Sequence, residues 1–219
     1  MKKKSISILQ LGLTVFFVVS LLISNVITGK QVLLPFGITM TGAVFLFPIT
    51  YVLSDLFSEV YGYKWSRFTC YLGFAMNLFM VLIFQLAIAT PAPDYWTNQA
   101  AFEIVLGNTP RILIASLLAM LVGDLINDKV FRRMKAKHPN THDGFSLRAI
   151  LSSLCGEIAD SLVFMPIAFI GQMPAMTLLI MSITQVSIKV AYEIVILPFT
   201  KMIVKKVSKY ENSLEVSYE

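Results

Sequence analysis

Long apolar runs, separated by short basic segments, constrain this chain more than any other feature of its sequence. Each run approaches the roughly 20 apolar residues that a helix needs to cross the hydrocarbon core of a bilayer. A helix satisfies its own backbone hydrogen bonds in lipid, so we predict an all-α integral membrane protein with one domain over residues 1–219. The six expected transmembrane helices are residues 7–28, 42–61, 68–90, 110–128, 147–170 and 175–200.

The distribution of basic residues predicts the orientation of these helices. Only 14% of the residues are charged, against roughly 25% in an average soluble domain. Lys and Arg gather before the first expected span and after the second, fourth and sixth, whereas the opposite connections contain only Lys30 and Arg111. Basic residues favour the cytoplasmic side, so we expect both termini there. The net charge of +5 therefore reflects topology and does not indicate a nucleic-acid partner.

The number of expected spans suggests an internal symmetry. Six spans divide into two groups of three, and an odd group reverses the orientation of the second. An inverted repeat of this kind is common in secondary transporters. Pro48 and Pro166 fall in the corresponding second and fifth spans. A 3+3 inverted repeat is therefore one organisation that we expect.

Ionisable side chains occur at similar depth in three expected spans. They are Asp55 and Glu59 in the second, Glu157 and Asp160 in the fifth, and Lys189 and Glu193 in the sixth. Charges in a hydrocarbon core are costly and usually functional. One lysine cannot neutralise five carboxylates, so we expect a polar cavity in which some acids are protonated, hydrated or reserved for a ligand. Asp160 and Lys189 have opposite charges at mid-span, and we predict that they lie close together.

Four further residues are candidates for the same cavity: Asn25, Asn77, Arg111 and Phe47. Each has a structural alternative, which is an interhelical hydrogen bond for the asparagines, a lipid headgroup contact for Arg111 and core packing for Phe47. The acids have alternatives too, because they can pair with Lys189 to hold helices together. Glu59 and Glu193 lie nearer the cytoplasmic end, from where their side chains can reach the interface.

Enzymatic motifs are missing from the sequence. It has no HExxH, GxSxG or phosphate-binding loop motif, and its two cysteines lack the paired spacing of a zinc site. We therefore expect no enzymatic activity, no cofactor and no bound metal. An intramembrane hydrolase with paired aspartates is the competing enzyme class.

Several motifs resemble those of the queuosine precursor transporters, also called the vitamin-uptake-transporter-like or DUF165 family. They are SNV at 24–26, FPITYVLSDLFSEVYG at 47–62, Arg111 with Ser116, ADS at 159–161, IAF at 167–169 and K-x2-YE-x4-P at 189–198. The resemblance covers nearly the whole chain. It implies a six-helix protein of the inner membrane that imports 7-cyano-7-deazaguanine or 7-aminomethyl-7-deazaguanine for queuosine modification of tRNA.

The chemistry of such a substrate suits an acidic site. A deazaguanine presents neighbouring donors at N1–H and the 2-amino group, and one carboxylate can accept both. Asp55 and Glu59 are the first candidates for this contact. The expected partners are this small molecule and the lipid bilayer, with a homodimer and the energy source left open. The alternative is a substrate-binding subunit of an energy-coupling-factor importer, although the first span lacks an AxxxA docking pattern.

Overall fold

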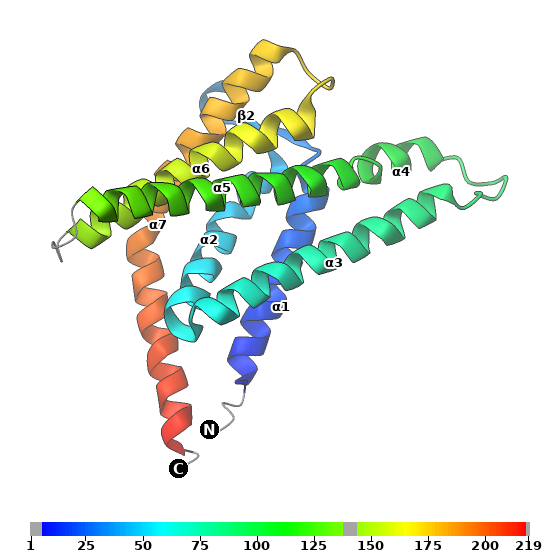
Figure 1. Ribbon diagram of the computed structural model, residues 1–219. Coiled ribbons are helices and arrows are strands. Elements are labelled where there is room, and N and C mark those ends of the chain that lie inside the picture. The colour runs from blue at the N-terminus through cyan, green and yellow to red at the C-terminus, as the bar shows by residue number, and fades with distance from the viewer. Residues whose placement is uncertain (1–5, 138–143, 218–219) are drawn as a thin grey trace. The chain divides into compact units, whose positions relative to one another are not determined.

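The computed structural model describes residues 6–137 and 144–217, and almost all of them are helical (Figure 1). The helices are α1 (Ile8–Ile27), α2 (Phe47–Leu56), α3 (Tyr63–Ala89), α4 (Gln99–Leu106), α5 (Thr109–Lys137), α6 (Gly144–Phe169) and α7 (Ala175–Ser217). Each of the six expected spans therefore coincides with at least part of an α-helix. The predominantly helical fold is confirmed, while the inverted repeat stays a prediction.

Short elements interrupt the first half of the chain. Strands β1 (Gln31–Leu34) and β2 (Ile38–Thr41) pair as a hairpin around a 3₁₀ turn, η1 (Pro35–Gly37), inside what we expected to be a plain connection. In this turn Phe36 has a φ of 66°, a left-handed conformation that is uncommon for a residue other than glycine. The tip of the hairpin is thus a tight local turn.

The second expected span, 42–61, is a composite rather than one α-helix. A 3₁₀ turn, η2 (Gly42–Phe45), precedes α2, and a π-helical turn, η3 (Phe57–Tyr61), follows it. Pro48 lies in the first turn of α2, where its missing N–H costs no helical hydrogen bond. Single π-helical turns often occur at functional sites, and this one contains Glu59.

The chain falls into two compact units, which we describe separately. The first unit combines α1 to α4 with the C-terminal part of α7, from Tyr192 onward. The second combines α5, α6 and the part of α7 up to Ala191 with most of the hairpin. The expectation of one domain over residues 1–219 stays a prediction.

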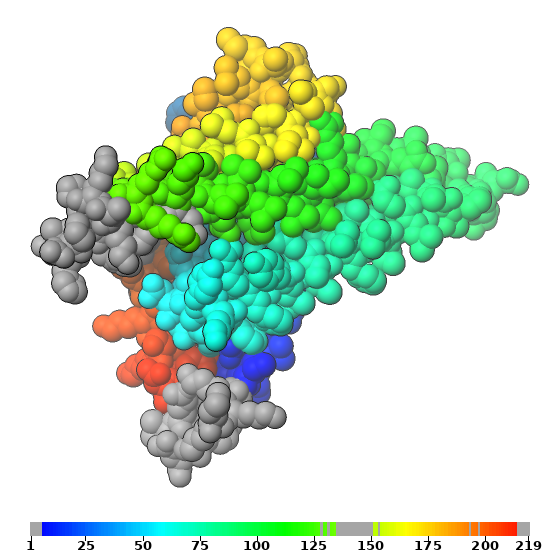
Figure 2. Space-filling view, viewed as in Figure 1, coloured from blue at the N-terminus to red at the C-terminus, as the bar shows by residue number. Residues whose placement is uncertain are grey.

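In the first unit, an apolar cluster joins α1, α2 and α7. Phe17 and Phe57 are buried and meet edge to face, with ring centroids 5.6 Å apart. Leu53 and Leu56 complete the buried part, and Val204 of α7 is one of the partly buried residues around it. Figure 2 shows the corresponding end of α7, in red, beside the start of α1, in blue. Apolar burial thus holds the C-terminal helix in this unit.

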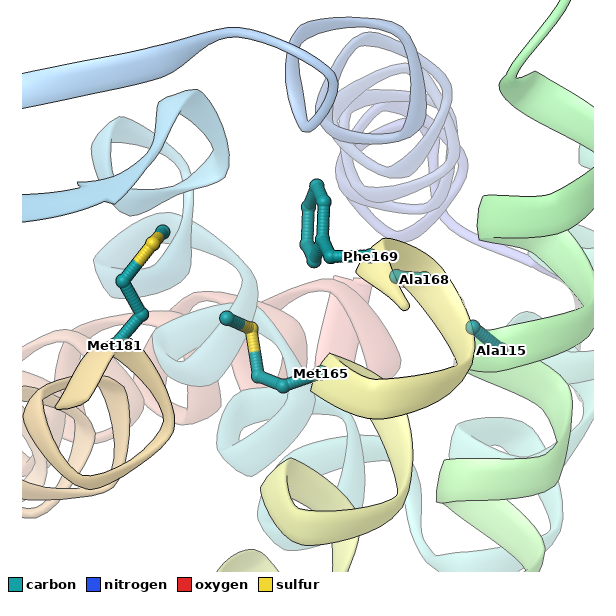
Figure 3. Packing of buried hydrophobic residues seen from close by; sticks show 5 residues of the cluster. All are labelled: Ala115, Met165, Ala168, Phe169 and Met181. Carbon is teal, nitrogen blue, oxygen red and sulfur yellow. The ribbon is translucent and has the colours of Figure 1, made fainter. Parts of the chain in front are cut away.

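In the second unit, α5 and α6 lie side by side (Figure 1). Buried apolar residues at one end of this pair include Met165 and Phe169 of α6, Ala115 of α5 and Met181 of α7 (Figure 3). Arg111 on α5 and Lys189 on α7, which are described below, lie on helices that this cluster holds together.

Four helical stretches among the described residues are long and apolar enough to cross a membrane. They are Ile8–Ile27, Tyr63–Ala89, Gln99–Met134 and Ala175–Ile196. The expected spans 42–61 and 147–170 do not belong to this set, and α2 has only ten residues. The count of six spans therefore stays a prediction.

Helix α3 shows the side-chain distribution of a lipid-facing helix. Its buried residues are Thr69, Gly73, Asn77 and Val81. Its exposed large side chains include Leu78, Phe79, Leu82, Ile83 and Leu86. Apolar residues thus face outward and small or polar residues face the protein, the reverse of a helix on the surface of a soluble protein.

Candidate functional site

The clearest polar site lies in the second unit, where α6 and α7 each contribute one charge. Lys189 Nζ donates a hydrogen bond of 2.9 Å to Asp160 Oδ2. The Lys189 side chain is 9% exposed and that of Asp160 is 30% exposed. The predicted proximity of these two residues is confirmed. A buried pair of this kind is costly to break, because the residue left behind keeps an uncompensated charge.

Two glycines bring Asp160 into position. A Cβ atom on Gly123 of α5 would lie 3.0 Å from the Gly156 carbonyl oxygen of α6 and 3.3 Å from Asp160 Cβ. A Cβ atom on Gly156 would lie 2.9 Å from the Gly123 carbonyl oxygen. Only residues without a side chain let two backbones approach this closely, as at many helix contacts in membranes. Asp160 follows Gly156 by one helical turn and is therefore held against α5.

Further polar residues lie near this pair along the same helices. Gln185 precedes Lys189 by one turn and is 3% exposed. Glu157 precedes Asp160 by three residues, so the two acids share a face of α6, and Glu157 is partly buried. Ser161 is fully buried, and its Oγ has no hydrogen-bond partner among the described residues. Such a site can hold a polar ligand or exchange a proton in a low-dielectric environment.

Arg111 has a structural contact that the sequence did not reveal. Its Nε donates to the Ile167 carbonyl oxygen and its Nη2 donates to that of Ile170, both at 2.6 Å. These carbonyls lie at the C-terminal end of α6, where the helix itself offers no donors. Arg111 therefore caps α6. Its assignment as a substrate contact stays a prediction.

The two acids of the second expected span lie in the first unit and are both exposed. Asp55 is in the last turn of α2, and Glu59 is in the π-helical turn η3. Phe47, at the start of α2, is partly buried and its ring lies 6.3 Å from that of Tyr51. The place of these three residues in a ligand cavity stays a prediction. Glu193 belongs to α7, but its side chain falls outside the described part of the structure.

The two candidate asparagines of the first unit are buried with unsatisfied polar atoms. Asn25 is 7% exposed, and neither its Oδ1 nor its Nδ2 has a hydrogen-bond partner among the described residues. Asn77 is 5% exposed; its Nδ2 donates to the Gly73 carbonyl oxygen at 3.2 Å, while its Oδ1 is unpartnered in the same sense. Each unsatisfied buried group costs about 1–3 kcal/mol.

Sequence reasoning missed two residues of the same kind on α3. Thr69 Oγ1 and Gln85 Nε2 also lack partners within residues 6–137 and 144–217. Thr69 and Asn77 belong to the buried face of α3 together with Gly73, whereas Gln85 lies two turns further along and is only partly buried. Polar residues inside an otherwise apolar helix were the available signal. As for metals, no group of three or more His, Cys, Asp or Glu within the described ranges is arranged to hold one.

Comparison with known proteins assigns the chain to a family. The sequence profile of the family described as "Putative vitamin uptake transporter" matches residues 41–203, well over half of the chain. The chain belongs to this family. All of the candidate residues named above except Asn25 fall within the matched range, and the resemblance seen in the motifs is confirmed. With its apolar helices, this member of the vitamin uptake transporter family is a multi-pass membrane protein.

One curated relative extends the comparison over nearly the full length. The chain is 26% identical over 204 residues, which is 93% of this chain and 88% of the relative, to a Bacillus subtilis (strain 168) protein named "Probable queuosine precursor transporter". No solved structure matches the chain.

Proposed function

We propose that this protein imports queuosine precursors, 7-cyano-7-deazaguanine or 7-aminomethyl-7-deazaguanine, across the inner membrane. The observation that carries a transport role is the ion pair between Lys189 and Asp160, held at 2.9 Å on helices of the family-matched region. Ionisable residues inside membrane helices are rare and mark the pathways of substrates and ions. The name of the Bacillus subtilis relative supplies the substrate class.

The acids of α2 and η3 are proposed to recognise the base. Asp55 and Glu59 are exposed, so a ligand reaches them without the protein first unfolding locally. A carboxylate that accepts from N1–H and the 2-amino group makes a bidentate, charge-assisted contact. Glu157, Asp160 and Lys189 are proposed to line the path of the substrate, because the aminomethyl form carries a cation that requires an additional acid.

The direct test is uptake of labelled deazaguanine into proteoliposomes, with and without a pH gradient. Guanine should compete, hypoxanthine should compete less because it lacks the 2-amino group, and adenine should compete poorly because its N1 is an acceptor. Asp55→Asn or Glu59→Gln should reduce uptake, since each replaces half of the acceptor capacity with a donor. Equal competition by adenine, or full uptake by both variants, would refute this recognition.

The proposed topology has six spans and cytoplasmic termini, and cysteine labelling tests it. In a background without Cys70 and Cys155, cysteines at Thr97 and Asn212 should react from opposite sides of the membrane. A protein with only the four long apolar spans would present both positions on the same side. That arrangement would also move the basic residues at the end of α5 to the outside, against the usual charge distribution.

Uptake of a vitamin is the second candidate function, because the matching family is described by vitamin uptake. In that case at least one compound in a panel of water-soluble vitamins should raise the melting temperature of the protein or be taken up into the proteoliposomes. Deazaguanines should do neither. If the chain is instead a subunit of an energy-coupling-factor importer, ATPase subunits should co-purify with it from the native membrane. Uptake by the purified protein alone argues against that assignment.

A further inference from the structure

Helices α1 and α3 of the first unit run in the same direction along a shared seam. Trp65 Nε1 donates to Thr14 Oγ1 at 3.3 Å near the start of both helices. Further along, a Cβ atom on Gly73 would lie 2.5 Å from Leu21 Cδ1, so the two helices are in close contact there. We call this contact the α1–α3 seam.

The unsatisfied asparagines occupy equivalent places in this seam. Asn25 follows Leu21 by four residues and Asn77 follows Gly73 by four, so each lies about one turn beyond the close contact. Both are buried, which excludes the explanation that their amides face water. A helix-to-helix hydrogen bond would be the usual use of a membrane asparagine, but neither amide makes one with the described residues.

A further unpaired polar atom lies on the buried face of α3. Thr69 lies on the same buried face of α3 as Gly73 and Asn77, and its Oγ1 also lacks a partner among the described residues. The large majority of buried side-chain polar atoms in proteins have a hydrogen-bond partner, either in the protein or in ordered water. Several unpaired atoms along one seam therefore indicate a place where a partner from outside the chain binds.

We propose that the α1–α3 seam binds a planar heterocycle through an edge on which a ring N–H and an acceptor atom stand side by side. The Asn25 carboxamide matches such an edge because it offers one acceptor and one donor next to each other. This inference rests on the proposed function, since free deazaguanine bases present such edges at N1–H with O6 and at N9–H with N3. Asn77 Oδ1 supplies a second acceptor.

The ligand enters the seam when α1 and α3 separate. The unpaired atoms are shielded from solvent in this structure, so a ligand reaches them only after the close contact between Leu21 and Gly73 opens. Opening lets water or the ligand satisfy the amides, which lowers the cost of leaving the closed arrangement. A ligand shifts this equilibrium only through its better binding to one state, and the amide contacts provide that difference.

Replacing Asn25 with leucine gives opposite effects on stability and on binding. In the purified full-length protein, Asn25→Leu should keep or raise the melting temperature, because a similar-sized apolar group replaces an unsatisfied polar one. It should weaken binding of 7-cyano-7-deazaguanine by about tenfold or more. Ser20→Ala is the matched control: Ser20 is also buried on α1, but its Oγ donates to the Phe16 carbonyl oxygen at 2.8 Å. That control should leave the affinity unchanged.

The outcomes separate this inference from the proposed function. If the wild-type protein binds neither 7-cyano-7-deazaguanine nor guanine, the proposed function fails and the seam inference falls with it. If the wild type binds and Asn25→Leu binds equally well, only the seam inference fails. A lower melting temperature or loss of folding in Asn25→Leu also overturns it, because the amide was then structural. Asn77→Leu is the second variant and should weaken binding as well, with some loss of stability from its bond to Gly73.

Discussion

Two buried polar sites, one in each unit of this protein, differ in whether their groups are paired. In the second unit the Lys189 ammonium, which is 9% exposed, meets the Asp160 carboxylate at 2.9 Å. In the first unit the Asn25 amide is equally buried but has no partner among the described residues. The pairing of its charges stabilises the first site. The second site lowers the stability of the fold, because its amide is buried without a hydrogen bond. Removing a polar group should therefore destabilise the protein at the Lys189–Asp160 pair and leave its stability unharmed at Asn25.

The largest effect is expected from breaking the charge pair. Lys189→Met removes the cation that meets Asp160, and Asp160→Asn removes the carboxylate that meets Lys189. Each single variant should lose about 3 kcal/mol, at the low end of the range for buried pairs because Asp160 is 30% exposed. The double variant should be more stable than the less stable single variant. Denaturation in detergent measures all three, and strictly additive losses would show that the two charges do not depend on each other.

A smaller effect is expected from filling the two glycine contacts, and it should differ between the units. Gly156→Ala places a methyl group 2.9 Å from the Gly123 backbone oxygen and 3.0 Å from Asn127 Cβ. Helices α5 and α6 then have to separate, at about 1–3 kcal/mol. Gly73→Ala meets only the end of the Leu21 side chain, at 2.5 Å, which can rotate away. In addition, alanine favours a helix over glycine by about 1 kcal/mol.

Thermal unfolding of the two variants tests this contrast. Gly156→Ala should melt at the lower temperature, and it should reduce the coupling between Asp160 and Lys189 in the double-variant experiment. Gly73→Ala should melt close to the wild type. If Gly73→Ala proves the more damaging substitution, then the α1–α3 seam is as rigid as the α5–α6 contact and does not open as proposed.

Much of the helical framework could be predicted from the sequence, because about 20 apolar residues in a row have few other stable forms in lipid. The meeting of Asp160 and Lys189 was also predictable, since two opposite charges at the same depth gain by pairing. The π-helical turn after Leu56 was not, because the segment FSEVY has no residue that excludes an ordinary α-helical turn. The hairpin at 31–41 was missed because its strands have only four residues each.

Two other features could not be predicted from the sequence, because one is a contact with backbone atoms and the other is a missing hydrogen bond. Arg111 binds two carbonyl oxygens of α6, and carbonyls are the same whatever the residue, so no sequence pattern marks them as partners. Asn25 was recognised as a candidate, but a sequence cannot tell whether a buried amide is satisfied. That property depends on all of the neighbours at once, and it decides whether the residue is structural or available to a ligand.

The smallest effect is expected at a third polar contact, which ties the C-terminal helix into the first unit. Glu211 Oε1 accepts hydrogen bonds from Tyr61 Oη at 2.8 Å and from Ser7 Oγ at 2.6 Å. Like the charge pair and unlike the seam, this contact is satisfied, but it is only partly buried. Ser7 also caps α1 by accepting from the Gln10 backbone N–H, so Tyr61 offers the simpler substitution.

Tyr61→Phe should cost about 1 kcal/mol, because it removes one hydrogen bond and keeps the ring. The phenyl group still packs against Phe57, whose ring centroid is 6.2 Å away. The comparison that isolates the bond uses Glu211→Ala as a background: there Tyr61→Phe should cost almost nothing, because the acceptor is already gone. An equal loss in both backgrounds would mean that the Tyr61 hydroxyl acts through another neighbour. A gain in stability from Tyr61→Phe would place this hydroxyl with the unsatisfied groups of the α1–α3 seam and would contradict its description as a satisfied contact.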